Sequence, residues 1–219
     1  MNFRHAFGGA VLLCAFLASG EAPMASVPEL VTRMQAFYEK TEDFSARFRQ
    51  EYRYASFKRT QTSNGTVTFK KPALMRWNYD SGKSFVLAGN KIYAFDPEAR
   101  TLTKASMGSH ALSASVTFLW GRGKLMDEFS ISRKACEKCE GVLLEMVPKK
   151  PDARFQKIVL EVDPKTAAVR KSTVTDPDGS ENAISFLDLK TNTRVTESFF
   201  RLAPPPDTTV QDLTAPPQK

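Results

Sequence analysis

Apolar and polar side chains alternate with a period of two along much of the chain. The clearest case is residues 44–54, where Phe44, Phe48 and Tyr52 share one face and arginines occupy the opposite face. Such alternation is typical of a half-buried β-strand. The pattern predicts a long strand with one apolar face and one charged face.

The stretch from residue 69 to 80 combines a corner with another strand. Pro72 removes a backbone donor and forces the corner, and residues 74–79 then place Met75, Trp77 and Tyr79 on one large apolar face. Taken alone, this face is interpreted as the core side of an antiparallel sheet.

Shorter segments of the same kind follow, separated by residues with turn chemistry such as Ser81-Gly82 and Asp96-Pro97. This spacing favours an up-and-down antiparallel meander over alternating helices and parallel strands. The predicted strands are residues 44–54, 66–69, 74–79, 85–87, 92–95, 101–104, 128–132, 142–147, 157–162, 169–176, 184–189 and 197–202.

Two segments have helical periodicity instead. Ser26 and Glu29 have capping-box spacing and are followed by apolar residues at helical intervals, which predicts an amphipathic helix over residues 26–40. Residues 109–120 have similar spacing before two glycines, so a helix or helical loop is expected there, lying over the sheet.

These elements predict one mainly β domain of the α+β class, with about eleven strands. A sheet of that size twists and curls toward a barrel, and if it stays open the helices must cover its mouth. The expected divisions are a signal peptide at 1–25, the domain at 26–203 and a proline-rich tail at 204–219.

The N-terminus indicates export. Arg4 precedes an apolar run over residues 6–18 that is too short to span a bilayer, and small residues follow it. Cleavage after Gly20, Ala22 or Ala25 fits this pattern. The predicted location of the mature chain is the periplasm.

Composition and charge exclude more than they identify. The formal net charge is +7, but an exported chain rarely meets nucleic acid, and the basic residues alternate along strands instead of clustering. An anionic membrane surface, an acidic partner patch or a solvated face remain as explanations. His110 has no assignable catalytic partner and is interpreted as a surface or helix residue. Without a phosphate loop or zinc-ligand cluster, we expect no enzyme activity, no metal and no cofactor.

Cys136 and Cys139 form the one chemical motif of the mature chain. A thioredoxin-like site would place such a pair at a helix start after a strand, whereas this pair falls between two predicted strands. In an oxidising compartment, a structural disulfide within a hairpin loop is the favoured interpretation, with a thiol oxidoreductase or half of a zinc site as the alternative.

Several segments together resemble the outer-membrane lipoprotein carrier family, LolA. They are the N-terminal helix, the long strand to Gln50, Phe-Lys-Lys-Pro-Ala-Leu-Met-Arg-Trp at 69–77, Lys-Ile-Tyr-Ala-Phe-Asp-Pro at 91–97, Asn-Ala-Ile-Ser-Phe at 182–186 and Phe-Phe-Arg-Leu-Ala-Pro-Pro at 199–205. The resemblance covers about residues 28–210.

The resemblance implies an incomplete antiparallel barrel, or half-barrel, of eleven strands with lid helices over an apolar cavity. It also implies a monomeric periplasmic carrier that receives acylated lipoproteins from an inner-membrane ATP-binding cassette exporter. The carrier would then pass them to an outer-membrane lipoprotein receptor. No nucleic acid is expected as a partner. A periplasmic regulatory module of the same fold, sensing lipid or lipoprotein, is the alternative function.

Strand parity and the resemblance together assign the cavity wall. Aromatic and methionine side chains suit such a wall because they offer large, adaptable apolar surface. The assigned residues are Met75 and Trp77, then Phe44, Phe48, Phe69 and Phe118, with Met34 and Phe37 from the lid helix.

This chain departs from the family pattern at two places. The family usually has an arginine before the corner proline that hydrogen-bonds to lid carbonyls when the cavity is empty, whereas Lys71 stands here. The resemblance therefore makes Lys71 the candidate lid latch. The pair Cys136 and Cys139 is also outside the general pattern.

Overall fold

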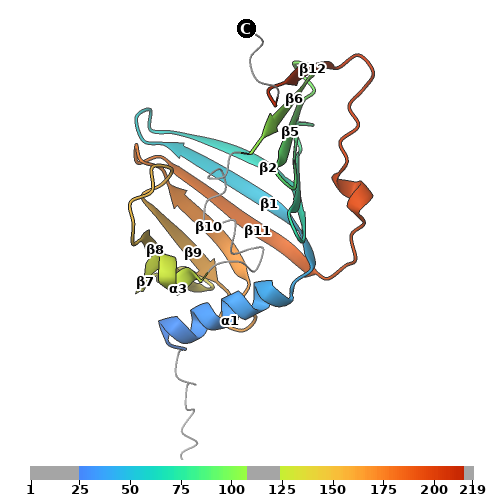
Figure 1. Ribbon diagram of the computed structural model, residues 1–219. Coiled ribbons are helices and arrows are strands. Elements are labelled where there is room, and N and C mark those ends of the chain that lie inside the picture. Colours follow the sequence, from blue (N-terminus) through green and yellow to red (C-terminus); the bar gives the residue numbers. More distant parts are fainter. Residues whose placement is uncertain (1–24, 108–123, 215–219) are drawn as a thin grey trace, which may run out of the picture.

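One large open sheet organises the molecule. The computed structural model describes residues 25–107 and 124–214, which contain a twelve-stranded sheet in the order β12-β6-β5-β4-β3-β2-β1-β11-β10-β9-β8-β7. Neighbouring strands are antiparallel, except that β12 runs parallel to β6. The sheet curls without its edges β12 and β7 meeting (Figure 1). The predicted mainly β, incomplete barrel is confirmed.

The elements follow one another as a meander, with few helical segments. In chain order they are α1 (Val27–Lys40), β1 (Asp43–Tyr54), β2 (Arg59–Lys70), β3 (Leu74–Tyr79), β4 (Ser84–Ala88), β5 (Lys91–Asp96), β6 (Thr101–Ser106), α3 (Leu125–Glu128), β7 (Phe129–Lys134), β8 (Val142–Pro148), β9 (Lys157–Val162), β10 (Val169–Thr175), β11 (Glu181–Thr191), the 3-10 helix η2 (Glu197–Phe200) and β12 (Thr209–Asp212).

Helix α1 begins where the capping pattern predicts. The Ser26 side chain accepts a hydrogen bond from the backbone N–H of Glu29 at 3.3 Å, and Pro28 lies in the first turn, where its missing donor costs nothing. Lys40 lies in the last turn, near the negative end of the helix dipole. The predicted helix at 26–40 is confirmed.

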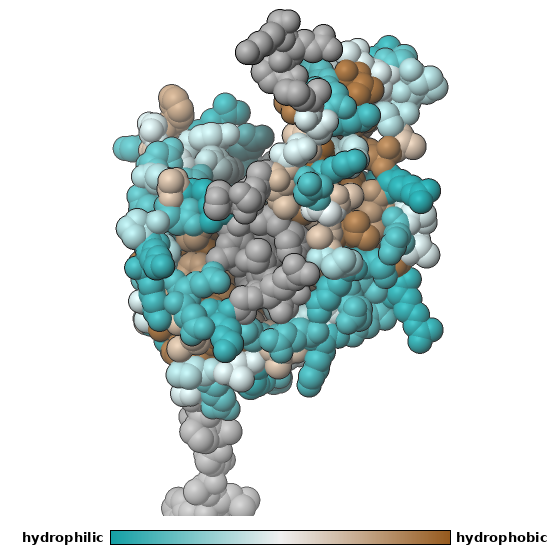
Figure 2. Space-filling model, in the orientation of Figure 1, coloured by the Kyte–Doolittle hydropathy of each residue, from teal (hydrophilic) through white to brown (hydrophobic). Residues whose placement is uncertain are grey.

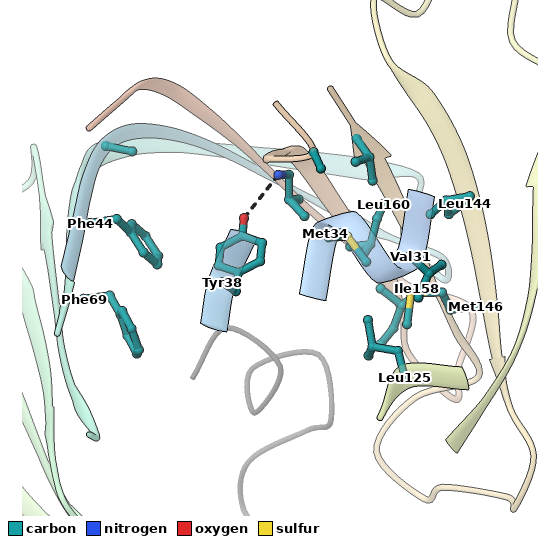
Figure 3. Packing of buried hydrophobic residues seen from close by; sticks show 14 of the residues in the cluster. Val31, Met34, Tyr38, Phe44, Phe69, Leu125, Leu144, Met146, Ile158 and Leu160 are labelled. Carbon is teal, nitrogen blue, oxygen red and sulfur yellow. Dashed lines mark hydrogen bonds between the residues drawn. The ribbon is translucent and has the colours of Figure 1, made fainter. Parts of the chain in front are cut away.

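The core lies between α1 and one face of the sheet, which we call the inner face. Leu30, Val31 and Met34 of α1 have no solvent exposure and belong to the same packed cluster as the strand residues. Directly opposed pairs on β8 and β9 supply much of the other side, as Figure 3 shows; these are Leu144 with Leu160 and Met146 with Ile158.

The C-terminal segment, residues 192–213, crosses the opposite, outer face of the sheet. Phe200 of η2 is 4% exposed, and η2 contacts β3 and β4. Arg76, on the outer side of β3, donates hydrogen bonds to the carbonyls of Phe199 at 2.9 Å and Arg201 at 3.3 Å. Val86 lies opposite Arg76 in the sheet register and is fully buried. A second, smaller apolar core therefore lies under this segment.

The predicted strand at 197–202 is wrong. A strand would send Phe199 and Phe200 to opposite faces, but the backbone coils into η2, so that Phe200 packs on the sheet and Phe199 contacts the Arg76 guanidinium at 5.3 Å from its ring centre. Part of the predicted tail, at 209–212, is ordered as β12, which pairs with β6 and has no apolar alternation.

Other expectations fall at boundaries or outside the described residues. Strand β2 begins at Arg59, earlier than the predicted 66, because its first half is a polar run that pairs with β1. The predicted helix at 109–120, with His110, and most of the predicted signal peptide lie outside the described residues. Among the described residues, no helix has the length and apolar character needed to span a membrane.

Candidate functional site

An open cavity of about 820 Å³ lies against the inner face of β3–β6. Its apolar wall includes Trp77, Tyr79, Phe85 and Ile184. Trp77 and Phe85 are directly opposed on β3 and β4, so their side chains share one face.

The wall is built around Phe48. Its ring contacts the rings of Trp77 and Tyr79 edge-on, at centroid distances of 4.8 and 5.2 Å. Gly65 lies opposite Phe48 on β2, and a Cβ there would stand 2.9 Å from the Phe48 ring and 2.0 Å from the carbonyl oxygen of Asn78. A side chain at residue 65 would therefore displace the aromatic cluster or separate two strands.

The polar groups near the cavity are neutral or paired. The Tyr79 hydroxyl donates to Gln50 at 3.3 Å, and Gln50 donates to Asn182 at 2.9 Å. Burial raises the pKa of Tyr79, so its phenol stays protonated at neutral pH. At the rim, Lys83 and Asp96 form an ion pair at 2.8 Å. Such a cavity suits apolar groups better than anions.

The structure divides the predicted cavity residues into two groups. Trp77 lines the open cavity, and Phe48 backs it. Phe37 is partly buried beside a smaller cavity of about 330 Å³, and Phe118 lies outside the described residues. The remaining predicted residues are at most 6% exposed within the packed core and are Met34, Phe44, Phe69 and Met75.

Tyr79, Phe85 and Ile184 line the cavity but were not among the predicted residues. Tyr79 shares the face of Trp77 by simple alternation along β3, so that signal was present in the sequence. Phe85 and Ile184 come from other strands, and only the strand register brings them to this wall. A single-strand pattern does not contain that information.

Helix α1 is attached to the sheet along its length. Arg33 donates to the carbonyls of Pro164 and Lys165 at 3.0 and 2.7 Å, and the buried Tyr38 hydroxyl accepts from the N–H of Val169 at 3.1 Å (Figure 3). Burial raises the pKa of Tyr38, which keeps this hydroxyl neutral. The middle of α1 and Tyr38 in its last turn are therefore fixed to the β9–β10 turn and to the start of β10.

The C-terminal end of α1 is also attached to the corner between β2 and β3. The Lys71 ammonium donates to the carbonyl of Glu39 at 2.7 Å, and the Lys71 backbone N–H donates to the carbonyl of Glu42 at 2.9 Å. Nearby, Tyr38 contacts the Phe44 ring, which stacks on Phe69. The predicted latch residue thus contacts this end of the helix through one side-chain bond.

The junction after α1 also holds the start of the C-terminal segment. Asp43 is 2% exposed and accepts from the Thr193 hydroxyl and from the backbone N–H groups of Thr193 and Arg194. Burial alone would raise the pKa of Asp43, but these hydrogen bonds, led by that from the Thr193 hydroxyl, outweigh it and lower the pKa.

Cys136 and Cys139 are joined by a disulfide in the loop between β7 and β8. The predicted bond is confirmed. Both half-cystines lie in an exposed or half-exposed loop, which the neighbouring Glu140 ties to Arg170 by an ion pair at 2.6 Å. Across residues 25–107 and 124–214, no group of three or more His, Cys, Asp and Glu side chains is placed to hold a metal ion.

Comparisons with known proteins point to one family. The model of the family described as outer membrane lipoprotein carrier protein LolA matches residues 39–203. The outer-membrane lipoprotein carrier protein of Methylobacillus flagellatus is 26% identical over 178 residues, which covers 80% of this chain and 85% of the relative. The Pseudomonas aeruginosa protein of the same name is 26% identical over 206 residues, covering 93% and 95%.

A solved structure shares the fold at low sequence identity. The uncharacterized conserved protein from Thermus thermophilus aligns with a TM-score of 0.54 at 12% identity, covering 86% of this chain and 99% of that one.

Proposed function

The chain belongs to the outer membrane lipoprotein carrier family LolA, and we propose that it is a periplasmic carrier that shields the acyl chains of lipoproteins. In this proposal, an inner-membrane ATP-binding cassette exporter supplies the lipoprotein and an outer-membrane receptor accepts it. The observation that supports the proposal most directly is the open cavity of about 820 Å³ with Trp77, Phe85 and Ile184 in its wall.

The cavity provides the right kind of driving force. Each methylene group moved out of water gains about 0.8 kcal/mol, so acyl chains supply a large gross gain wherever apolar surface can receive them. The wall is aromatic and carries no unpaired charge near its centre, since Tyr79 is neutral and Lys83 is paired with Asp96. An anionic headgroup would find little compensation there, whereas hydrocarbon finds a matching surface.

We further propose that cargo enters by displacing the C-terminal end of α1. The Tyr38, Phe44 and Phe69 rings at this end pack on one another through aromatic contacts, which an acyl chain can replace. Lys71 would then act as the latch, because its bond to Glu39 has to break when this end moves. The bond from the Val169 N–H to Tyr38 would break as well, while the middle of α1, held by Arg33, would stay in place.

The most direct test is to identify what the protein carries. Protein recovered from the periplasm is extracted with organic solvent, and the extract is examined by mass spectrometry. Acylated peptides support the lipoprotein carrier, whereas free phospholipid as the bound material, or no lipid at all, contradicts it.

A matched pair of variants tests the site. Phe85→Glu places a carboxylate in the cavity wall, where an unpaired charge opposes hydrocarbon, so uptake of acylated cargo should fall steeply. Val147→Glu places the same group at a position that is 44% exposed on β8 and should leave uptake unchanged. Equal uptake by both folded variants would show that cargo does not bind in this cavity.

A further inference from the structure

The tip of the β1–β2 hairpin, residues 54–59, exposes an aromatic side chain to solvent. Phe57 is 79% exposed, more than any other large hydrophobic side chain among the described residues. Figure 2 shows a hydrophobic knob at this hairpin, at the upper left, among hydrophilic side chains. The ring is therefore available for a contact outside the chain.

The tip is held out by ordered structure. Each strand of the hairpin has twelve residues, paired as far as Tyr54 opposite Arg59. The Ala55 N–H donates to the Ser180 hydroxyl at 3.2 Å, which fixes the base of the tip to the β10–β11 turn. The Tyr54 ring meets the Phe57 ring edge-on at 6.5 Å. Phe57 is therefore presented by a supported turn.

Basic side chains surround the exposed ring. Lys58 and Arg59 directly follow Phe57, are exposed, and take part in no ion pair among the described residues. Arg53, near the end of β1, forms an ion pair with Glu181 at 3.1 Å. The tip thus combines one apolar ring with two free positive charges.

The acidic groups of the neighbouring β10–β11 turn are engaged within the protein. Asp176 accepts from the Tyr52 hydroxyl at 2.7 Å, and Asp178 accepts from the hydroxyl and backbone N–H of Ser180 at 2.9 Å. Asp176 is thus bonded to β1, and Asp178 to its own turn. The outermost charges of the tip are those of Lys58 and Arg59.

We propose that this hairpin tip docks on the anionic headgroup surface of a lipid bilayer, with Phe57 entering the interface and Lys58 and Arg59 contacting the headgroups. An apolar ring flanked by basic side chains matches the two components of such a surface, its apolar interior and its negative potential. One ring and two charges give weak, reversible binding. The proposal does not depend on what the inner cavity holds.

Vesicle sedimentation tests the proposal with protein recovered after export. Wild type should sediment with vesicles of phosphatidylcholine mixed with phosphatidylglycerol, less with phosphatidylcholine alone, and less again as salt is raised. Phe57→Ser should weaken binding about tenfold, because the apolar contact is lost. Lys58→Gln and Arg59→Gln should each weaken it about fivefold.

Two control variants separate this site from general stickiness. Leu213→Ser removes another hydrophobic side chain, 67% exposed, and Lys138→Gln removes another exposed positive charge. Both should bind vesicles as wild type does. Absence of wild-type binding to anionic vesicles overturns the proposal, and so does binding that Phe57→Ser leaves intact or that the controls reduce equally. If the tip binds an acidic protein instead of lipid, the wild type should not bind anionic vesicles.

Discussion

The two halves of the inner face have the same sheet beneath them but differ in what lies above. Over β8 and β9, α1 fills the space with aliphatic side chains, and residues such as Leu144 and Leu160 have no exposure. Over β3–β6, Trp77 and Phe85 remain half-buried beside an open cavity. The filled half is a conventional core, whereas the open half keeps apolar surface available.

The difference teaches which side chains suit each purpose. Branched aliphatic groups interlock at fixed volumes and give a rigid, densely packed interior. The aromatic groups of the open half expose broad flat surface that accepts ligands of varying shape without repacking. The filled strands thus serve stability, while the proposed function assigns binding to the open strands. The predictions below test that separation, beginning with the largest effect.

Leu160→Ala should destabilise the protein far more than Phe85→Ala. The first leaves a void in the filled half and should cost about 2–5 kcal/mol. The second removes a half-buried ring beside space that is already open, so its cost should be about 1 kcal/mol. Urea unfolding at neutral pH measures both. Similar losses would mean that the two halves are packed alike.

Replacing Cys136 and Cys139 together by serine should cost at most about 2 kcal/mol, since the disulfide closes a loop with a sequence separation of only three. Transfer of lipoprotein to outer membranes should be unchanged, because the loop lies outside both halves of the inner face. Thermal unfolding and a transfer assay check the two parts. A folded double variant that no longer transfers would give the pair a functional role.

Asp163 should make the filled half sensitive to acid. The Thr166 N–H and the Arg170 guanidinium outweigh burial and hold the pKa of Asp163 at about 2, below about 3.9 for an unfolded chain. Its stabilisation is therefore complete above about pH 4 and disappears as pH falls toward 2.

Asp163→Asn should lower stability by about 1 kcal/mol at neutral pH, after allowance for solvent screening, and by much less near pH 2. Unfolding by urea across this pH range measures the difference. Glu137→Gln, at an exposed position of the β7–β8 loop, is the control and should change little. A difference between Asp163→Asn and wild type that persisted at pH 2 would contradict the linkage.

Substitutions of Lys71 test whether the C-terminal end of α1, which lies between the two halves, controls entry of cargo. Arginine can hold two carbonyls where lysine holds one, so Lys71→Arg should favour the closed helix, bind acylated cargo about threefold more weakly and pass it on more readily. Lys71→Leu loses the bond to Glu39 and should do the reverse. Loading and transfer of labelled lipoprotein measure both. Identical behaviour of the three proteins would show that this contact does not govern entry.

Most of the fold could be predicted from the sequence because most of its elements are determined by local sequence patterns. The Ser26 cap and the alternation from Phe44 to Tyr54 each depend on near neighbours, and both appear as expected. The strand predicted at residues 197–202 is instead a 3-10 helix at Glu197–Phe200. Its conformation depends on Arg76, which lies on a distant strand and binds the Phe199 carbonyl. Long-range contacts of this kind leave no periodic signal.

The candidate site was predicted less completely than the fold, for a related reason. The structure places Trp77, predicted for the cavity wall, beside the open cavity, but alternation does not say whether α1 lies above a residue. Met75 has the same parity and is buried in the core, at 6% exposure. Phe85 joins Trp77 only through the pairing of β3 with β4. The parity of a residue along its strand gives the face on which it lies. Whether α1 covers that position decides between core and cavity.

Strand β12 has a consequence for the order in which the protein is completed. It pairs with β6, about a hundred residues earlier in the chain, through bonds such as Thr209 N–H to the Arg100 carbonyl at 2.9 Å. Until residues 209–212 pair with it, β6 presents an unpaired backbone edge to other copies of the chain. Strand β12 therefore protects the sheet against strand-to-strand aggregation. Chains truncated before Thr209 should keep their inner core yet aggregate as they are produced.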